Sequence, residues 1–132
     1  FGSKNDHAVG ESIRDRLIPG LREESSNLSG ETSLAEAIDL LSCADAVVSN
    51  DSGLMHVAAA LNRPLVAVYG STSPGFTPPL ADHVEIVQLG IECSPCFERT
   101  CRFGHYNCLR LLEPDSVIRA LGQLGGTPVE VA

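Results

Sequence analysis

The stretch Ala46-Val-Val-Ser-Asn-Asp-Ser-Gly-Leu-Met-His-Val-Ala-Ala-Ala-Leu61 decides the fold of this 132-residue chain. It predicts a short buried strand over residues 45–49, a polar turn, and an alanine-rich helix over residues 53–61. A strand that leads directly into a helix favours anion binding, because free backbone N–H groups and the positive end of the helix dipole both face the ligand. The turn therefore predicts a binding site for a phosphate-bearing ligand.

The side chains of this turn suit a diphosphate attached to a sugar. Asp51 supplies a carboxylate, Ser52 a hydroxyl and His56 an imidazole, while Gly53 allows close approach of a ligand. From local sequence alone, Asp51 and Ser52 are also explained as helix caps, and His56 as a packed polar residue. Local sequence leaves both interpretations open.

Helices and short apolar strands alternate along the rest of the chain. Residues 4–18 carry a helical stripe that Pro19-Gly20 stops, and Leu28 is expected to end a short edge strand. Ser33 and Glu36 have the spacing of a capping box, which opens the next helix. The remaining expected elements are helices over 34–43 and 117–124 and strands over 65–69 and 84–87.

This alternation predicts an α/β domain, with a Rossmann-like, mainly parallel sheet and helices on both faces. Ligands of such sheets bind at the carboxyl ends of the strands. We expect Phe1-Gly2-Ser3 to be the end of a strand, so Asp6, the turn 50–53 and the loop 70–73 all fall at such ends. We expect one domain over residues 1–124 and a flexible tail over 125–132. Because the first residue is not Met, we also expect a fragment of a longer protein.

Composition limits the partners of the chain. Its formal charge of −8 argues against binding the phosphate backbone of a nucleic acid. The same charge disfavours docking on an anionic membrane by charge alone. No apolar run approaches the roughly 20 residues that span a bilayer, and no signal peptide is visible.

Four of the five cysteines gather in a cysteine-rich insert (residues 91–110). Cys93, Cys96, Cys101 and Cys108 have a spacing that fits a tetrahedral zinc site, two disulfides or free thiols. Cys43 lies outside the insert, on an apolar helix face, and is expected to be a buried small hydrophobe. The insert is also locally basic through Arg99, Arg102 and Arg110, which we interpret as a solvated face in preference to a contact with a phosphorylated substrate.

The run from Asn50 to Leu61 resembles the hallmark of family 9 glycosyltransferases, the ADP-heptose:lipopolysaccharide heptosyltransferases. The resemblance continues through the runs 63–74 and 76–80, which are most similar to one branch of the family, and includes residues 28–34 upstream. It covers essentially the whole chain, with several separate motifs in the family's order.

The resemblance implies the C-terminal half of a GT-B glycosyltransferase, which holds the sugar nucleotide. It implies that the start of the helix lies near the diphosphate and heptose, through Asp51, Ser52, Gly53 and His56. It also implies that Thr32 lies beside the adenine and that Asp6 binds the ribose. The catalytic base and the acceptor site of the family lie in its N-terminal domain, so no catalytic residue is expected here. The fragment by itself is expected to bind donor and not to turn it over.

The implied reaction is an inverting, metal-independent transfer of heptose from ADP-heptose to the lipid A–core oligosaccharide. It needs no cofactor, although a structural zinc on the four cysteines would be compatible with it. The implied partners are these substrates and the N-terminal domain of the same protein. The implied place is the cytoplasm, at the inner face of the inner membrane, with peripheral membrane contact.

Two other hypotheses fit parts of the sequence. In one, the chain is a non-catalytic α/β module whose insert binds zinc and mediates interaction. In the other, it belongs to a different GT-B enzyme such as a sugar-nucleotide epimerase, but residues 50–61 speak against this.

Overall fold

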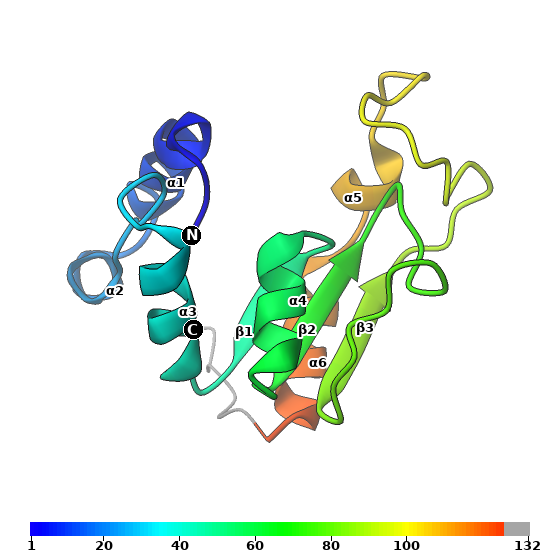
Figure 1. Cartoon of the computed structure of the whole chain (residues 1–132). Coiled ribbons are helices and arrows are strands. Elements are labelled where there is room, and N and C mark those ends of the chain that lie inside the picture. The colour runs from blue at the N-terminus through cyan, green and yellow to red at the C-terminus, as the bar shows by residue number, and fades with distance from the viewer. Residues whose placement is uncertain (126–132) are drawn as a thin grey trace. The chain divides into compact units, whose positions relative to one another are not determined.

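The computed structural model describes residues 1–125, and contacts divide the chain into two compact units. The N-terminal unit comprises Phe1–Leu40, and the C-terminal unit begins at Leu41. Figure 1 shows the order of the elements along the chain. The expected tail 125–132 lies outside the described residues except for Gly125.

The N-terminal unit consists of short helices. Its elements are the 3-10 helix Lys4–Asp6, α1 (His7–Arg14), α2 (Pro19–Glu24) and α3 (Leu34–Ser42), whose last two residues fall in the C-terminal unit. The strands expected at residues 1–3 and before Leu28 are absent from residues 1–40. The helix expected over residues 4–18 does end before Pro19, at Arg14, but Pro19 then begins α2 instead of a polar connection. Proline suits the first position of a helix, where its missing N–H has no partner to lose.

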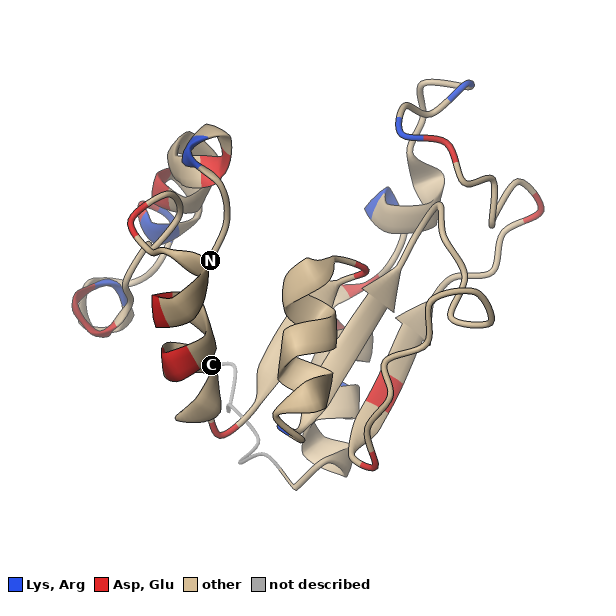
Figure 2. Cartoon of the chain, in the orientation of Figure 1, with Lys and Arg blue, Asp and Glu red and all other residues tan. Residues whose placement is uncertain are grey.

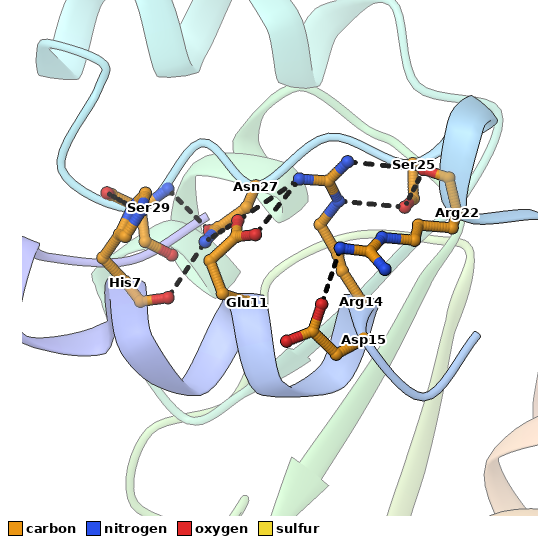
Figure 3. Close-up of polar contacts among 8 residues, drawn as sticks. All are labelled: His7, Glu11, Arg14, Asp15, Arg22, Ser25, Asn27 and Ser29. Atoms are coloured by element: carbon orange, nitrogen blue, oxygen red, sulfur yellow. Dashed lines mark hydrogen bonds and ion pairs between the residues drawn. The ribbon is translucent and has the colours of Figure 1, made fainter. Parts of the chain in front are cut away.

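Asn27 ties the segment after α2 to α1 (Figure 3). Its amide nitrogen donates to the carbonyl oxygen of His7 at 3.0 Å and to the carboxylate of Glu11 at 2.9 Å, while its oxygen accepts from the N–H of Ser29 at 3.2 Å. A Cβ on Gly10 would come within 2.5 Å of the Asn27 side chain. Gly10 therefore leaves the room in which Asn27 lies against the helix.

The C-terminal unit is built on a three-stranded parallel sheet in the order β1-β2-β3. The strands are β1 (Val47–Asn50), β2 (Leu65–Tyr69) and β3 (Val84–Gln88). Val47 pairs with Leu65, and Leu65 with Val84. β2 is central and buried, as its continuous apolar sequence predicts.

Helices cover both faces of this sheet. Figure 1 shows α4 (Gly53–Ala60) on one face and α6 (Pro114–Gln123) on the other. α4 buries Met55, Ala58 and Ala59, which are spaced three and four residues apart and so share one side of the helix. They pack against three side chains of β2 to form the core. The α/β fold with a parallel sheet and helices on both faces is thus confirmed.

The cysteine-rich insert (residues 91–110) lies between β3 and α6. It contains one short helix, α5 (Asn107–Arg110), which the sequence pattern did not predict. Within residues 1–125, no helix is long and apolar enough to cross a membrane.

Candidate functional site

The β1–α4 turn lies at the carboxyl edge of the sheet, as predicted. β1 ends at Asn50, the N–H of Asp51 donates to the carbonyl oxygen of Val68 at 3.2 Å, and α4 begins at Gly53. The loop after β2 begins at the same edge, because β1 and β2 run parallel. The structure therefore brings the turn 50–53 and the loop 70–73 together.

Ser52 occupies the N-cap position of α4, but its side chain makes no capping hydrogen bond. Its hydroxyl lies 3.2 Å from that of Ser49, which is also 2.9 Å from the carbonyl oxygen of Asn50. Because the single hydrogen of Ser49 goes to Asn50, Ser52 donates to Ser49. The N-cap side chain thus leaves the N–H groups at the start of α4 open to a ligand, as far as residues 1–125 show.

Asp51 is held by a residue that sequence reasoning missed. Its carboxylate accepts a hydrogen bond from the hydroxyl of Thr77 at 3.0 Å. The carbonyl oxygen of Thr77 in turn accepts from the hydroxyl of Tyr69 at 2.6 Å. The only signal in the sequence was that Thr77 falls in one of the runs that resemble the family. Thr77 therefore links Asp51 to the core.

Tyr69 connects this network to α4. Its hydroxyl lies 3.5 Å from the sulfur of Met55, and its side chain is only 1% exposed. Burial raises the pKa of Tyr69, the charge of Asp51 raises it further, and the hydrogen bond to Thr77 opposes both. Tyr69 thus stays protonated and acts as a fixed donor at neutral pH.

Gly53 and His56 leave the start of α4 open. A Cβ on Gly53 would meet nothing within 4 Å, so packing does not require a glycine there. His56 is exposed, and its ring has no hydrogen-bond partner among residues 1–125. The open space at Gly53 and the exposed ring of His56 can therefore both face a ligand at the first turn.

Asp6 and Thr32 belong to the N-terminal unit. Asp6 does not follow a strand, and its Oδ2 accepts from the N–H and the hydroxyl of Ser3 at 2.8 and 2.6 Å. The hydroxyl bond, and then the backbone bond, lower the pKa of Asp6. Thr32 is half-buried, two residues before α3. Their predicted roles toward ribose and adenine stay predictions.

The cysteine predictions need correction. Cys43 is exposed, because α3 ends at Ser42 and leaves it in the following turn. Cys93, Cys96, Cys101 and Cys108 are free thiols, and within residues 1–125 no three His, Cys, Asp or Glu side chains are placed to hold a metal ion. The zinc-binding alternative is therefore not supported.

Backbone contacts fix two parts of the insert that carry these thiols. The N–H groups of Cys96 and Phe97 donate to the carbonyl oxygen of Ser71 at 3.0 and 2.7 Å, which fixes this part of the insert on the loop after β2. Cys101 faces its own turn instead. The N–H of Tyr106, with smaller contributions from residues 103–105, lowers the pKa of the Cys101 thiol.

The fold matches that of a solved glycosyltransferase. The structure of Escherichia coli ADP-heptose lps heptosyltransferase II superposes with a TM-score of 0.80 at 43% identity, over 94% of this chain and 34% of that one. Residues 1–107 match the model of glycosyltransferase family 9 (heptosyltransferase). This chain belongs to glycosyltransferase family 9.

Curated relatives agree with this membership. Lipooligosaccharide heptosyltransferase 2 of Haemophilus ducreyi is 44% identical over 94% of this chain and 36% of its own length. The protein of the same name from Haemophilus influenzae is 58% identical over 67% of this chain and 26% of its own. Lipopolysaccharide heptosyltransferase 2 of Escherichia coli K12 is 42% identical over 94% of this chain and 36% of its own length. The chain spans about a third of the length of these relatives.

Proposed function

We propose that this chain is the donor-binding part of an enzyme that transfers heptose from ADP-heptose to the inner core of lipopolysaccharide. The family match and the names of the relatives support the reaction class. The matching Escherichia coli protein is an ADP-heptose heptosyltransferase, which supports ADP-heptose as the donor. The relatives are about three times as long, so a second domain of the same protein would carry the acceptor site.

The β1–α4 turn carries this proposal structurally. The first-turn N–H groups of α4 have no side-chain cap, and Gly53 leaves open space beside them. A diphosphate bound there would accept from these N–H groups and gain from the helix dipole. His56 would add a donor, and Asp51, oriented by Thr77, would accept from sugar hydroxyls.

The chemistry would be an inverting displacement at the anomeric carbon. ADP leaves with growing negative charge, which donors already aimed at the diphosphate stabilise. A base on the facing domain would take the proton of the acceptor hydroxyl, so no residue of this chain is assigned as the catalytic base. The reaction would need neither a metal nor another cofactor.

The remaining assignments follow from the same hypothesis. Asp6 would bind the ribose through Oδ1, which its bonds to Ser3 leave free, and Thr32 would lie beside the adenine. The acceptor would be the lipid A–core oligosaccharide. The enzyme would act in the cytoplasm, at the inner face of the inner membrane, through peripheral contact.

ADP binding to the intact protein tests the proposal. Titration with ADP is expected to shift the amide resonances of residues 51–56, because the open N–H groups at the start of α4 would meet the diphosphate. A second series with the Thr77→Val variant should change the shift at Asp51 while the other amides still respond. Incubation with ADP-heptose and acceptor should release ADP.

Two outcomes would overturn the proposal. Amides of residues 51–56 that stay unchanged at millimolar ADP would remove the donor site. In the second outcome, the protein binds ADP in the titration but releases no ADP when it is incubated with ADP-heptose and acceptor. That result would support a nucleotide site and contradict the proposed reaction. GDP serves as the control ligand, because a merely electrostatic site would accept both diphosphates equally.

A further inference from the structure

The cysteine-rich insert carries a concentration of positive charge that lies outside the β1–α4 turn. It contains three arginines and two glutamates, in a chain whose formal charge is −8. Figure 2 shows basic positions at the outer loop of the insert and on α5, while acidic positions dominate elsewhere. The insert thus differs in charge from the rest of the chain.

A small hollow lies inside this insert. Its volume is about 120 Å³, and it is lined by Arg99, Arg102, Phe103, His105 and Tyr106, together with the four cysteines. A wider open groove of about 680 Å³ shares Arg102, Phe103 and His105 with it. Two arginines, one histidine and two aromatic residues therefore border the hollow.

Contacts with rings hold one of the guanidinium groups in place. Arg102 lies over the ring of Phe103 at 5.8 Å, and the Phe103 ring stacks on His105 at 5.5 Å. A guanidinium on an aromatic face keeps its N–H donors free at its edge. Both ion pairs among residues 1–125 are made by arginines of the N-terminal unit, so Arg99 and Arg102 have no carboxylate partner there.

His105 adds a donor of defined direction. Its Nδ1 accepts a hydrogen bond from the N–H of Asn107 at 3.0 Å. The proton of the neutral ring therefore sits on Nε2, which is free to donate. Glu98 also lines the hollow and Glu92 lines the groove, so two carboxylates oppose an anion there.

We propose that this hollow binds a phosphate group, carried by a phosphorylated sugar or by a lipid headgroup. Forked guanidinium donors match phosphate oxygens, and a charge-assisted hydrogen bond is about twice as strong as a neutral one. The volume of the hollow accommodates one phosphate, and the adjoining groove accommodates the group that carries it. This site uses none of the residues assigned to the donor, so it stands independently of the proposed function.

A titration of the intact protein with inorganic phosphate tests the site, in the presence of saturating ADP so that a donor site is already filled. The amide resonances of residues 99–107 are expected to shift in a saturable manner. The Arg99→Ala and Arg102→Ala variants should each weaken binding about tenfold, since each removes a charge-assisted contact. Glu98→Gln should tighten it about threefold, because a competing carboxylate is removed.

Arg110→Ala is the matched control. Arg110 is in the same insert and lies over Tyr106 at 5.9 Å, but it does not line the hollow. Its loss should change affinity less than about twofold, by screened charge alone. Equal weakening by all three arginine variants, or no saturable shift at residues 99–107, would overturn the proposal.

A second arm distinguishes the two carriers of the phosphate. Phosphatidylcholine vesicles with added phosphatidic acid are sedimented with the protein, and glucose 6-phosphate is titrated separately. Retention on the vesicles that is lost in Arg102→Ala identifies a lipid headgroup. A sugar phosphate that binds more tightly than inorganic phosphate, without retention on vesicles, identifies a phosphorylated sugar. If neither carrier binds more tightly than inorganic phosphate, the carrier part of the proposal is wrong.

Discussion

The starts of α3 and α4 present the same residue type in two different states. Ser33 precedes α3, and its hydroxyl accepts from the N–H of Glu36 at 3.3 Å. The carboxylate of Glu36 accepts in return from the N–H and the hydroxyl of Ser33 at 2.8 and 2.7 Å. Ser52 precedes α4 and makes no such bond. One helix start is closed by its own side chains and the other is left open.

This difference separates stability from binding. A capping box stabilises the helix that it closes and leaves little for a ligand to satisfy. An open start costs the fold a cap but keeps N–H groups for an anion. A serine precedes both helices, so the residue three positions later decides whether the helix start is capped. Glu36 accepts from the N–H of Ser33, whereas Met55 is buried in the core and forms no such bond.

The largest expected effect comes from filling the open start. Gly53→Ala should lower ADP affinity by about tenfold, which corresponds to about 1.4 kcal/mol, because a methyl group then occupies space that the ligand needs. Thermal stability should stay the same or rise slightly, since alanine favours a helix more than glycine does. Isothermal titration and thermal unfolding of the intact protein measure the two quantities.

Gly122→Ala is the control for this change, because it too is a helical glycine with nothing within 4 Å of an added Cβ. Its stability should rise by about 0.5–1 kcal/mol, with ADP affinity unchanged. If both variants bind ADP as the parent does, Gly53 does not border the ligand.

Removing the closed cap should affect stability alone. Ser33→Ala is expected to lower the free energy of unfolding by about 1 kcal/mol, the usual effect of losing an N-cap side chain. ADP affinity should not change. Denaturant unfolding with ADP titration checks both, and a loss of affinity equal to the loss at Gly53 would contradict the comparison.

Removing the hydroxyl at the open start of α4 should lower ADP affinity and leave stability almost unchanged. The loss of affinity should be smaller than that of Gly53→Ala. Ser52→Ala loses a bond to Ser49 and no cap, so stability should change by less than about 0.5 kcal/mol. ADP affinity should fall about threefold through one lost neutral hydrogen bond. The same two measurements apply, and a stability loss as large as that of Ser33→Ala would show that Ser52 caps α4 after all.

The smallest effect concerns pH. The hydroxyl of Ser33 and then its N–H lower the pKa of Glu36. A carboxyl group whose pKa is lower in the folded state stabilises the fold above its ordinary value of about 4.3, and this contribution is lost as pH falls through the lowered pKa. Glu36→Gln should therefore reduce the difference in melting temperature between about pH 6 and about pH 3, which lie on either side of that range. If this difference in melting temperature is unchanged, Glu36 does not contribute to the loss of stability in acid.

Local signals predicted the parts of the fold that depend on neighbouring residues. The spacing of Ser33 and Glu36 predicted a capping box, and the apolar run 65–69 predicted a buried strand with the observed bounds. The turn 50–53 was placed correctly at the carboxyl edge of the sheet. Each of these predictions rests on a hydrophobic periodicity or on a pair of residues no more than four positions apart.

What the sequence could not predict depends on distant contacts or on competing local preferences. Thr77 meets Asp51 across 26 positions, and no pattern near either residue signals that bond. Pro19 indicates a helix stop because the helical stripe before it ends nearby, although proline equally suits a helix start. The exposure of Cys43 follows from where α3 ends, and helix ends are less certain than helix centres.

The packing of Gly70 has a consequence for how this domain can change. A Cβ at this position would come within 2.7 Å of the Leu109 side chain, and Ser94 donates to the carbonyl oxygen of Gly70. The loop after β2 and the insert thus fit each other as a pair. A larger residue at position 70 would require a smaller one at position 109, so the two should vary together in evolution, and a chimaera that exchanges the insert alone should pack poorly unless it also carries the partner loop.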